Sequence, residues 1–244
     1  MHAHGLRGSL QNNQFTLIYP LVSLVGSIAG FVQAKKWGGF KSLLGRSLSL
    51  FSLGLFAQFL GQAAYAYYIY IKQIEVPYPS LGDIGFFGSV VFYVIGAYYL
   101  ALVSGMKSSA RSWKGKLISV VLALIMLCLS YTVFLRGYVF DGSFSLKTVL
   151  DFGYPLGQAV YVSIALMALL FSKNSLGGSL RKPILFLLCA LVIQYLSDFT
   201  FLYQVNAGTW YVGGVNDYMY LVSYFFMTLA LVNIGTIFTS IKEA

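Results

Sequence analysis

Residues 77–100 read PYPSLGDIGFFGSVVFYVIGAYYL, and this stretch decides the fold because a turn-forming cluster and Asp83 open a long apolar run. A run of about twenty apolar residues is long enough to cross a hydrocarbon core as a helix. The pattern returns twice, as FGYPLGQAVYVSIALMALL from Phe152 and as YVGGVNDYMYLVSYFFMTLALV from Tyr211. The repetition raises the question of why a carboxylate stands at the start of such a run.

The composition of the whole chain indicates an integral membrane protein. Of its 244 residues, 58% are hydrophobic and only 9% are charged, whereas a soluble domain carries about 25% charged residues. The alternating pattern of a membrane β-barrel is absent. We therefore predict one all-α domain over residues 1–244, a bundle of seven transmembrane helices. Their expected ranges are about 14–34, 46–71, 82–104, 116–137, 149–172, 184–204 and 216–239.

The basic residues indicate how the chain is oriented. The connections between helices 1–2, 3–4 and 5–6 hold eleven of the sixteen, and the N-terminus and opposite connections hold four. Because short cytoplasmic loops are enriched in Lys and Arg, the N-terminus is expected outside and the C-terminus in the cytoplasm. The net charge of +9 is then a topology signal, with membrane lipids as partners rather than nucleic acid. The eleven are Lys35, Lys36, Lys41, Arg46, Lys107, Arg111, Lys114, Lys116, Lys173, Arg181 and Lys182.

Helical hairpins of similar sequence repeat along the chain. The segment from Gln58 to Gln62 is matched by the segment from Gln194 to Asp198, and each continues into an aromatic run and an outer loop. A helix headed by a carboxylate, Asp83 or Asp217, follows in both cases. The middle hairpin is more diverged, and its second helix begins YPLGQ at Tyr154. We predict one helix followed by three repeated hairpins.

The three candidate aspartates have different explanations. Asp83 and Asp217 each lie near a helix start, where unpaired backbone N–H groups and the helix dipole favour an anion, so capping could explain both. Asp198 lies about fourteen residues into its helix, which at about 1.5 Å per residue places it deep in the membrane. A carboxylate at that depth indicates a functional site by default.

Other polar residues predict a cavity that opens outward. Six of the seven acidic residues, namely Glu75, Asp83, Asp141, Asp151, Asp198 and Asp217, fall on the outer side or in the outer half. The glutamines have a simpler alternative role, interhelical hydrogen bonding. Most of the nineteen tyrosines, among them Tyr65, Tyr203, Tyr218 and Tyr220, are expected in the aromatic belt at the membrane surface. A minority that faces inward beside the carboxylates could line a pocket or stack on a cation. The candidate ligand-binding residues are Gln58, Gln62, Asp83, Tyr154, Gln158, Gln194, Asp198 and Asp217.

Several chemistries have no support in the sequence. The last helix has no lysine for a retinal Schiff base, and no histidine lies in the predicted bundle. No nucleotide-binding glycine loop, catalytic triad or metal-ligand spacing occurs. We expect no enzymatic activity, no cofactor and no metal.

The segments PYPSLGDIGFFGSVVFYVIGAYYL, LDFGYPLGQAVYVSIALMALL and the span from DFTFLYQ through GTWYVGGVNDYMYLVSYFFMTLALV resemble a widespread multi-pass sensor domain of prokaryotes. That domain usually precedes diguanylate cyclase (GGDEF), EAL phosphodiesterase or histidine-kinase modules. The resemblance covers helices 2 to 7 and places the polar positions of the family on Asp83, Gln158, Asp198 and Asp217. Gln158 departs from the usual aspartate, Gly82 replaces a common alanine, and Tyr218–Tyr220 lacks the common tryptophan. The resemblance implies a sensory role in the cell (inner) membrane.

Three functions are compatible with these observations. The first is a stand-alone sensory domain that binds a small polar, cationic or lipid-like ligand and signals through a cytoplasmic partner. The second is a small transporter with its site in the outer half of the membrane, since transporters also use internal repeats and polar groups. The third is a structural or assembly subunit whose carboxylates only cap helices.

Overall fold

The computed structural model describes residues 9–74, 76–106, 113–132, 145–172, 178–206 and 208–243. Every regular element within these ranges is helical. The elements are α1 (Leu10–Ile18), α2 (Pro20–Lys36), the 3₁₀ turn η1 (Gly39–Lys41), α3 (Leu43–Ala66), the π-helical turn η2 (Tyr67–Lys72), α4 (Leu81–Val103), α6 (Trp113–Ser130), α7 (Leu146–Phe171), α8 (Arg181–Asn206) and α9 (Val215–Glu243).

Seven helical segments in the described ranges are long and apolar enough to cross a membrane, which confirms the predicted class. All seven begin one to four residues earlier than predicted, and polar caps precede several of the apolar runs. Ser9, Ser42 and Ser145 each accept a hydrogen bond from a backbone N–H in the first turn of the helix that follows. Residues 133–137 of the predicted fourth helix, together with Glu75 and Asp141, lie outside the described residues.

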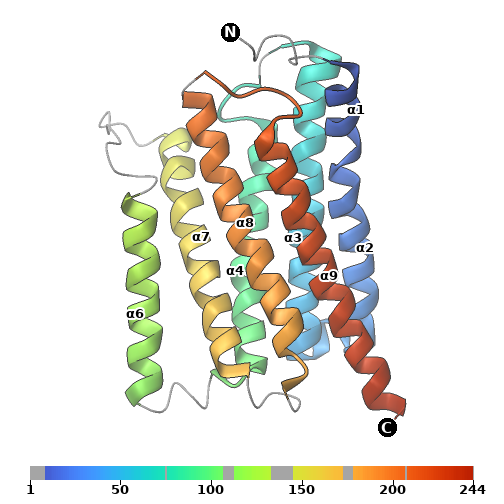
Figure 1. Cartoon of the computed structure of the whole chain (residues 1–244), viewed down its shortest axis with the longest axis vertical. Helices are drawn as coiled ribbons and strands as arrows, with labels where there is room; N and C mark the ends of the chain where they lie inside the picture. The colour runs from blue at the N-terminus through green and yellow to red at the C-terminus, as the bar shows by residue number, and fades with distance from the viewer. Residues whose placement is uncertain are drawn as a thin grey trace.

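The helices run up and down beside one another (Figure 1). We call the top of Figure 1, where α4, α7 and α9 begin, the upper end, and the opposite side the lower end. Helix α3 packs against α2 and α4, α4 packs against α7, and α9 packs against α8 and α2. Helix α6 contacts mainly α7 and stands at the edge of the bundle. Positions between α3, α4, α7, α8 and α9 are therefore enclosed by helices on several sides.

The first span is two helices rather than the single one predicted. Helix α1 ends at Ile18, and α2 begins at Pro20. Proline suits the first turn of a helix, where the N–H that it lacks has no partner within the helix. Tyr19 stands at the junction with only 2% of its surface exposed. The break thus coincides with a tyrosine that is directed into the bundle.

The expectation that the fifth helix begins at the YPLGQ segment is wrong, because Pro155 lies inside α7. The helix begins earlier, since the side chain of Ser145 accepts a hydrogen bond from the backbone N–H of Thr148 at 3.2 Å. Pro155 has no N–H for the carbonyl of Asp151, one turn before it. Its own carbonyl accepts a hydrogen bond from Ser130 Oγ of α6 at 2.8 Å. The proline site thus joins α6 to α7.

Candidate functional site

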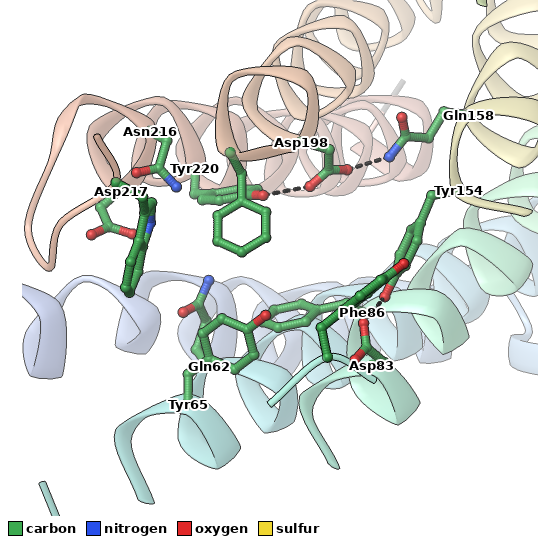
Figure 2. Close-up of a pocket in the computed structure, with 13 residues that line it drawn as sticks. Gln62, Tyr65, Asp83, Phe86, Tyr154, Gln158, Asp198, Asn216, Asp217 and Tyr220 are labelled. Carbon is green, nitrogen blue, oxygen red and sulfur yellow. Dashed lines mark hydrogen bonds between the residues drawn. The ribbon is translucent and has the colours of Figure 1, made fainter. Parts of the chain in front are cut away.

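A cavity lies at the upper end of the bundle, between α3, α4, α7, α8 and α9 (Figure 2). The space open to the centre of a water-sized sphere is about 60 Å³, several times the roughly 10–15 Å³ that one water molecule needs. It can hold a few water molecules or a small solute. The lining residues are Gln62, Tyr65, Tyr78, Asp83, Phe86, Tyr154, Gln158, Asp198, Phe201, Trp210, Asn216, Asp217 and Tyr220.

Asp83 caps α4 and also faces the cavity. One carboxylate oxygen accepts hydrogen bonds from the backbone N–H of Ser80 at 2.7 Å and from its hydroxyl at 3.1 Å. Ser80 Oγ accepts one from the N–H of Gly82, which completes a capping box. The other oxygen accepts a hydrogen bond from Tyr154 Oη of α7 at 2.8 Å. Asp83 therefore starts its helix and also links it to α7.

Replacing Ser80 with alanine is expected to destabilise the protein by about 1 kcal/mol, because the side-chain cap of α4 is lost. The measurement is thermal unfolding in detergent. The matched control is Ser119→Ala in α6, where the hydroxyl bonds only to the carbonyl of Gly115 in its own helix. Equal shifts for the two variants would contradict the capping role.

Asp217 holds the start of α9 in a similar way. One of its oxygens accepts a hydrogen bond from the N–H of Gly213 at 2.7 Å, and the other accepts one from Tyr19 Oη at 3.1 Å. Gly213 has a φ of 74°, a conformation that glycine adopts without steric cost. Asp217 thus joins the first span to the last, through the tyrosine at the α1–α2 junction.

Asp198 has no capping role, because it lies well inside α8. Its two oxygens accept hydrogen bonds from Tyr220 Oη of α9 and from the side-chain amide of Gln158 on α7. Figure 2 shows the three side chains in a row along one side of the cavity. Asp198 is half-buried, and its hydrogen-bond partners come from both neighbouring helices.

The cavity is acidic and has no compensating cation within the described part of the chain. Asp83, Asp198 and Asp217 line it together with seven aromatic residues, and no Lys, Arg or His is among its lining residues. None of the three forms an ion pair with a described residue; their partners are neutral donors. Removing a carboxylate from water without a counter-charge is costly. A positively charged occupant would supply that counter-charge.

Some buried polar groups beside the cavity lack partners. Asn216 is 0% exposed, and neither its Oδ1 nor its Nδ2 forms a hydrogen bond with any described residue. The indole N–H of Trp210 and Oε1 of Gln158 are also unpaired within the described ranges. Unpaired buried polar groups are rare in folded proteins and call for an explanation such as a bound water or ligand.

Of the eight predicted site residues, the structure brings six to the cavity: Gln62, Asp83, Tyr154, Gln158, Asp198 and Asp217. Gln58 and Gln194, one helical turn below Gln62 and Asp198, do not line it and instead bond between helices. Ser223 Oγ donates to Gln194 Oε1 at 3.1 Å. For these two glutamines, interhelical hydrogen bonding, the simpler alternative to ligand binding, describes the contacts observed.

Most of the aromatic lining was not predicted. Tyr65 and Tyr220 were expected in the surface belt, yet both line the cavity, and Tyr220 is only 7% exposed. Tyr203 and Tyr218 are 64% and 53% exposed, as belt residues would be. The sequence could have indicated Asn216 as a lining residue, because it directly precedes the candidate residue Asp217. Phe86, Phe201 and Trp210 carried none, because apolar aromatic residues are frequent throughout this chain.

A directed chain of hydrogen bonds leads downward from the cavity. Gln62 Nε2 donates to Tyr224 Oη over a long 3.4 Å, and Tyr224 Oη donates to Gln58 Oε1 at 2.9 Å. Gln58 Nε2 then donates to Ser89 Oγ at 2.7 Å, and Ser89 donates to the carbonyl of Phe86. The chain crosses from α3 to α9, back to α3 and on to α4. One lining residue is thus linked to the packing of three helices.

The loop above the cavity is held by Tyr78, whose hydroxyl donates to Asp151 at 2.7 Å. Burial raises the pKa of Tyr78 above its usual range, and the hydrogen bond and negative charge of Asp151 raise it further. The hydroxyl therefore stays protonated and remains a donor. This contact fixes the loop before α4 to the start of α7.

Comparison of the chain with known protein families, with curated proteins and with solved structures finds no match. The functional interpretation therefore depends on the geometry of the cavity and on the sequence.

Proposed function

We propose that this protein is a membrane sensory domain that binds a small polar or cationic ligand in the cavity and passes a helix rearrangement to a signalling partner. One observation carries the proposal: an acidic, aromatic cavity with unpaired buried amide groups lies within a bundle of seven potential membrane helices. Pockets with a few convergent polar groups are the usual form of small-molecule sites. The resemblance to prokaryotic sensor domains supports the same role.

The contacts around the cavity supply a means of coupling. Asp198 connects α8 to α7 and α9, and the chain from Gln62 connects α3 to α9 and α4. A ligand can shift the bundle only by binding one arrangement of these helices more tightly than another. A ligand that contacts Asp198 or Gln62 would act directly on the side chains that hold the helices together.

The proposed topology places the cavity outside and the partner in the cytoplasm. Most described basic residues lie at the lower end, in the segments that join α2 to α3 and in the first turns of α6 and α8, whereas Lys72 and Lys147 lie at the upper end. By the positive-inside rule this end is cytoplasmic. The N-terminus is then extracytoplasmic and the C-terminus cytoplasmic, with the chain in the cell (inner) membrane. The proposed internal repeat accounts for Asp83 and Asp217 having the same position in the first turns of α4 and α9.

The packing below the cavity favours a sensor over a transporter. A transporter needs a polar path to the lower end, but the described core there consists mainly of apolar side chains, with buried serines such as Ser47 and Ser104 whose hydroxyls donate to backbone carbonyls. Leu48, Phe51 and Leu55 of α3 are at most 1% exposed, as are Leu100 of α4 and Leu231 of α9. A structural subunit with purely capping carboxylates would leave the position of Asp198 in mid-helix unexplained.

Native mass spectrometry of the protein in mild detergent tests the proposal. The wild type is expected to carry a small adduct that Asp198→Asn lacks. Asp198→Asn is preferable to a variant of Asp83, which also caps α4. The control is Ser104→Ala, which removes a buried polar group at the lower end, outside the cavity lining, and is expected to retain the adduct. The same adduct on all three proteins, or none on any of them, would count against the proposal.

A further inference from the structure

We infer that the ligand is a small organic ammonium ion that bears a hydroxyl group, with a methylated nitrogen as in choline. This inference rests on the proposed function and specifies the chemistry of the same cavity. Three independent features carry it: carboxylates bonded only to neutral donors, a continuous aromatic wall and an unpaired buried amide.

The carboxylates have hydrogen-bond donors but no counter-charge. Each oxygen of Asp83, Asp198 and Asp217 accepts at least one hydrogen bond, from a tyrosine, a serine, a glutamine amide or a backbone N–H. A ligand therefore need not supply further N–H donors to satisfy these oxygens. What the cavity lacks is positive charge, because no basic side chain lines it in the described part of the chain. An alkylated ammonium ion supplies charge without requiring additional hydrogen-bond acceptors.

An aromatic wall provides the surface that such an ion prefers. The rings of Phe86 and Tyr65 pack edge to face with centroids 5.1 Å apart, and Tyr65 lies 6.3 Å from Phe201. Phe201 in turn packs edge to face on Trp210 at 5.9 Å. The electron-rich faces of such rings attract cations, and aromatic cages recognise quaternary ammonium groups. The methyl groups also gain from leaving water.

Asn216 accounts for the hydroxyl group. Its amide offers both an unpaired donor and an unpaired acceptor, and a hydroxyl group can act as both. Figure 2 shows this amide on the side of the cavity where Asp217 and Tyr220 lie. A carboxylate on the ligand would instead meet Asp217 at that side, so an amino alcohol fits better than an amino acid.

The same chemistry could come from a free solute or from a lipid headgroup. A phospholipid headgroup adds a phosphate, and no basic side chain lines the cavity to receive it among the described residues. The cavity space of about 60 Å³ also suits a small ion. These features favour the free amino alcohol, and the experiment separates the two sources.

The test compares choline with 3,3-dimethyl-1-butanol, a neutral molecule of nearly the same shape. The protein is placed in nanodiscs of phosphatidylglycerol, which contain no ammonium headgroup, and binding is measured by isothermal titration calorimetry and thermal stabilisation. Choline is expected to bind at least about tenfold more tightly than the neutral analogue, because only choline gains the electrostatic interactions. Equal binding of the two compounds would overturn the inference.

Variants and a second lipid complete the design. Asp198→Asn and Trp210→Leu should each reduce the preference for choline, whereas Ser104→Ala at the lower end should retain it; unfolding of each protein without ligand verifies that it is folded. If both cavity variants keep the full preference, choline binds elsewhere and the inference fails.

In phosphatidylcholine nanodiscs, stabilisation without added choline would support the same ligand chemistry with a lipid source. If choline binds neither as a free solute nor as a lipid headgroup, ammonium ions are excluded as the ligand. An adduct of different chemistry that depends on Asp198 would, in that case, still support the proposed function.

Discussion

Replacing Gly85 with alanine is expected to destabilise the protein by about 3 kcal/mol, because α3 and α4 touch backbone to backbone at this position. A Cβ atom on Gly85 would lie 2.4 Å from the carbonyl oxygen of Ala57 and 2.5 Å from the backbone nitrogen of Gly61. Neither atom can rotate away as a side chain could, so the helices must separate. The measurement is the free energy of unfolding in detergent micelles.

Gly88→Ala is the matched control, one turn further along α4. A Cβ atom there would meet no atom within 4 Å. Because alanine is the better helix former, we expect this variant to change stability by less than about 1 kcal/mol, in the stabilising direction. Equal destabilisation by the two substitutions would show that loss of glycine, rather than the close approach to α3, is responsible.

Replacing Tyr224 with phenylalanine is expected to destabilise the protein by about 2 kcal/mol, because it leaves buried polar groups without partners. Tyr224 is fully buried, and its hydroxyl donates to Gln58 and accepts from Gln62. It does not line the cavity. Thermal unfolding should therefore shift while the adduct seen by native mass spectrometry is retained.

Tyr98→Phe in α4 is the control for the loss of a tyrosine hydroxyl. Its side chain is 46% exposed, and we expect almost no change in stability. If Tyr224→Phe also left stability unchanged, the chain of hydrogen bonds below the cavity would not hold α3 to α9. If it abolished the adduct, Tyr224 would belong to the binding site rather than to the link between helices.

The Gly85 and Tyr224 variants test two separate features: the packing of α4 against α3, and the hydrogen bonds that join the cavity lining to α9. Gly85 sets how closely α4 approaches α3, and so how the lining residues of these helices face one another. Tyr224 joins α9 to α3 through a hydrogen bond. In the proposed sensor, the first contact maintains the shape of the cavity and the second transmits its occupancy.

The fold class was predictable from the sequence, because the length of an apolar run and the residues that cap it act over short stretches. Seven such runs were found in nearly the right places, and the capping role expected of Asp83 is confirmed in its bonds to Ser80. The expected start of the fifth helix at YPLGQ was wrong, although the expected range 149–172 includes Pro155; the helix begins after the capping residue Ser145. The cap at Ser145 favours an early helix start and Pro155 a later one, and the sequence pattern does not show which effect is stronger.

The site was predictable only in part. The position of Asp198 along its helix indicated a buried polar group, but its partners on α7 and α9 are 40 and 22 residues away. Gln58 and Gln62 have the same side chain on the same helix face and both bond between helices, yet only Gln62 lines the cavity. Tyr65 and Tyr203 belong to the same expected belt, and only Tyr65 lines the cavity.

The sequence by itself determined the membrane class, the helices and the caps, because these depend on composition and on residues within a few positions of one another. The tertiary structure alone decided which polar and aromatic groups meet. That outcome depends on how helices distant in the chain pack, and on how deep each side chain then lies. The cavity exists because five helices bring three carboxylates and an aromatic lining together, and no local pattern specifies such a meeting.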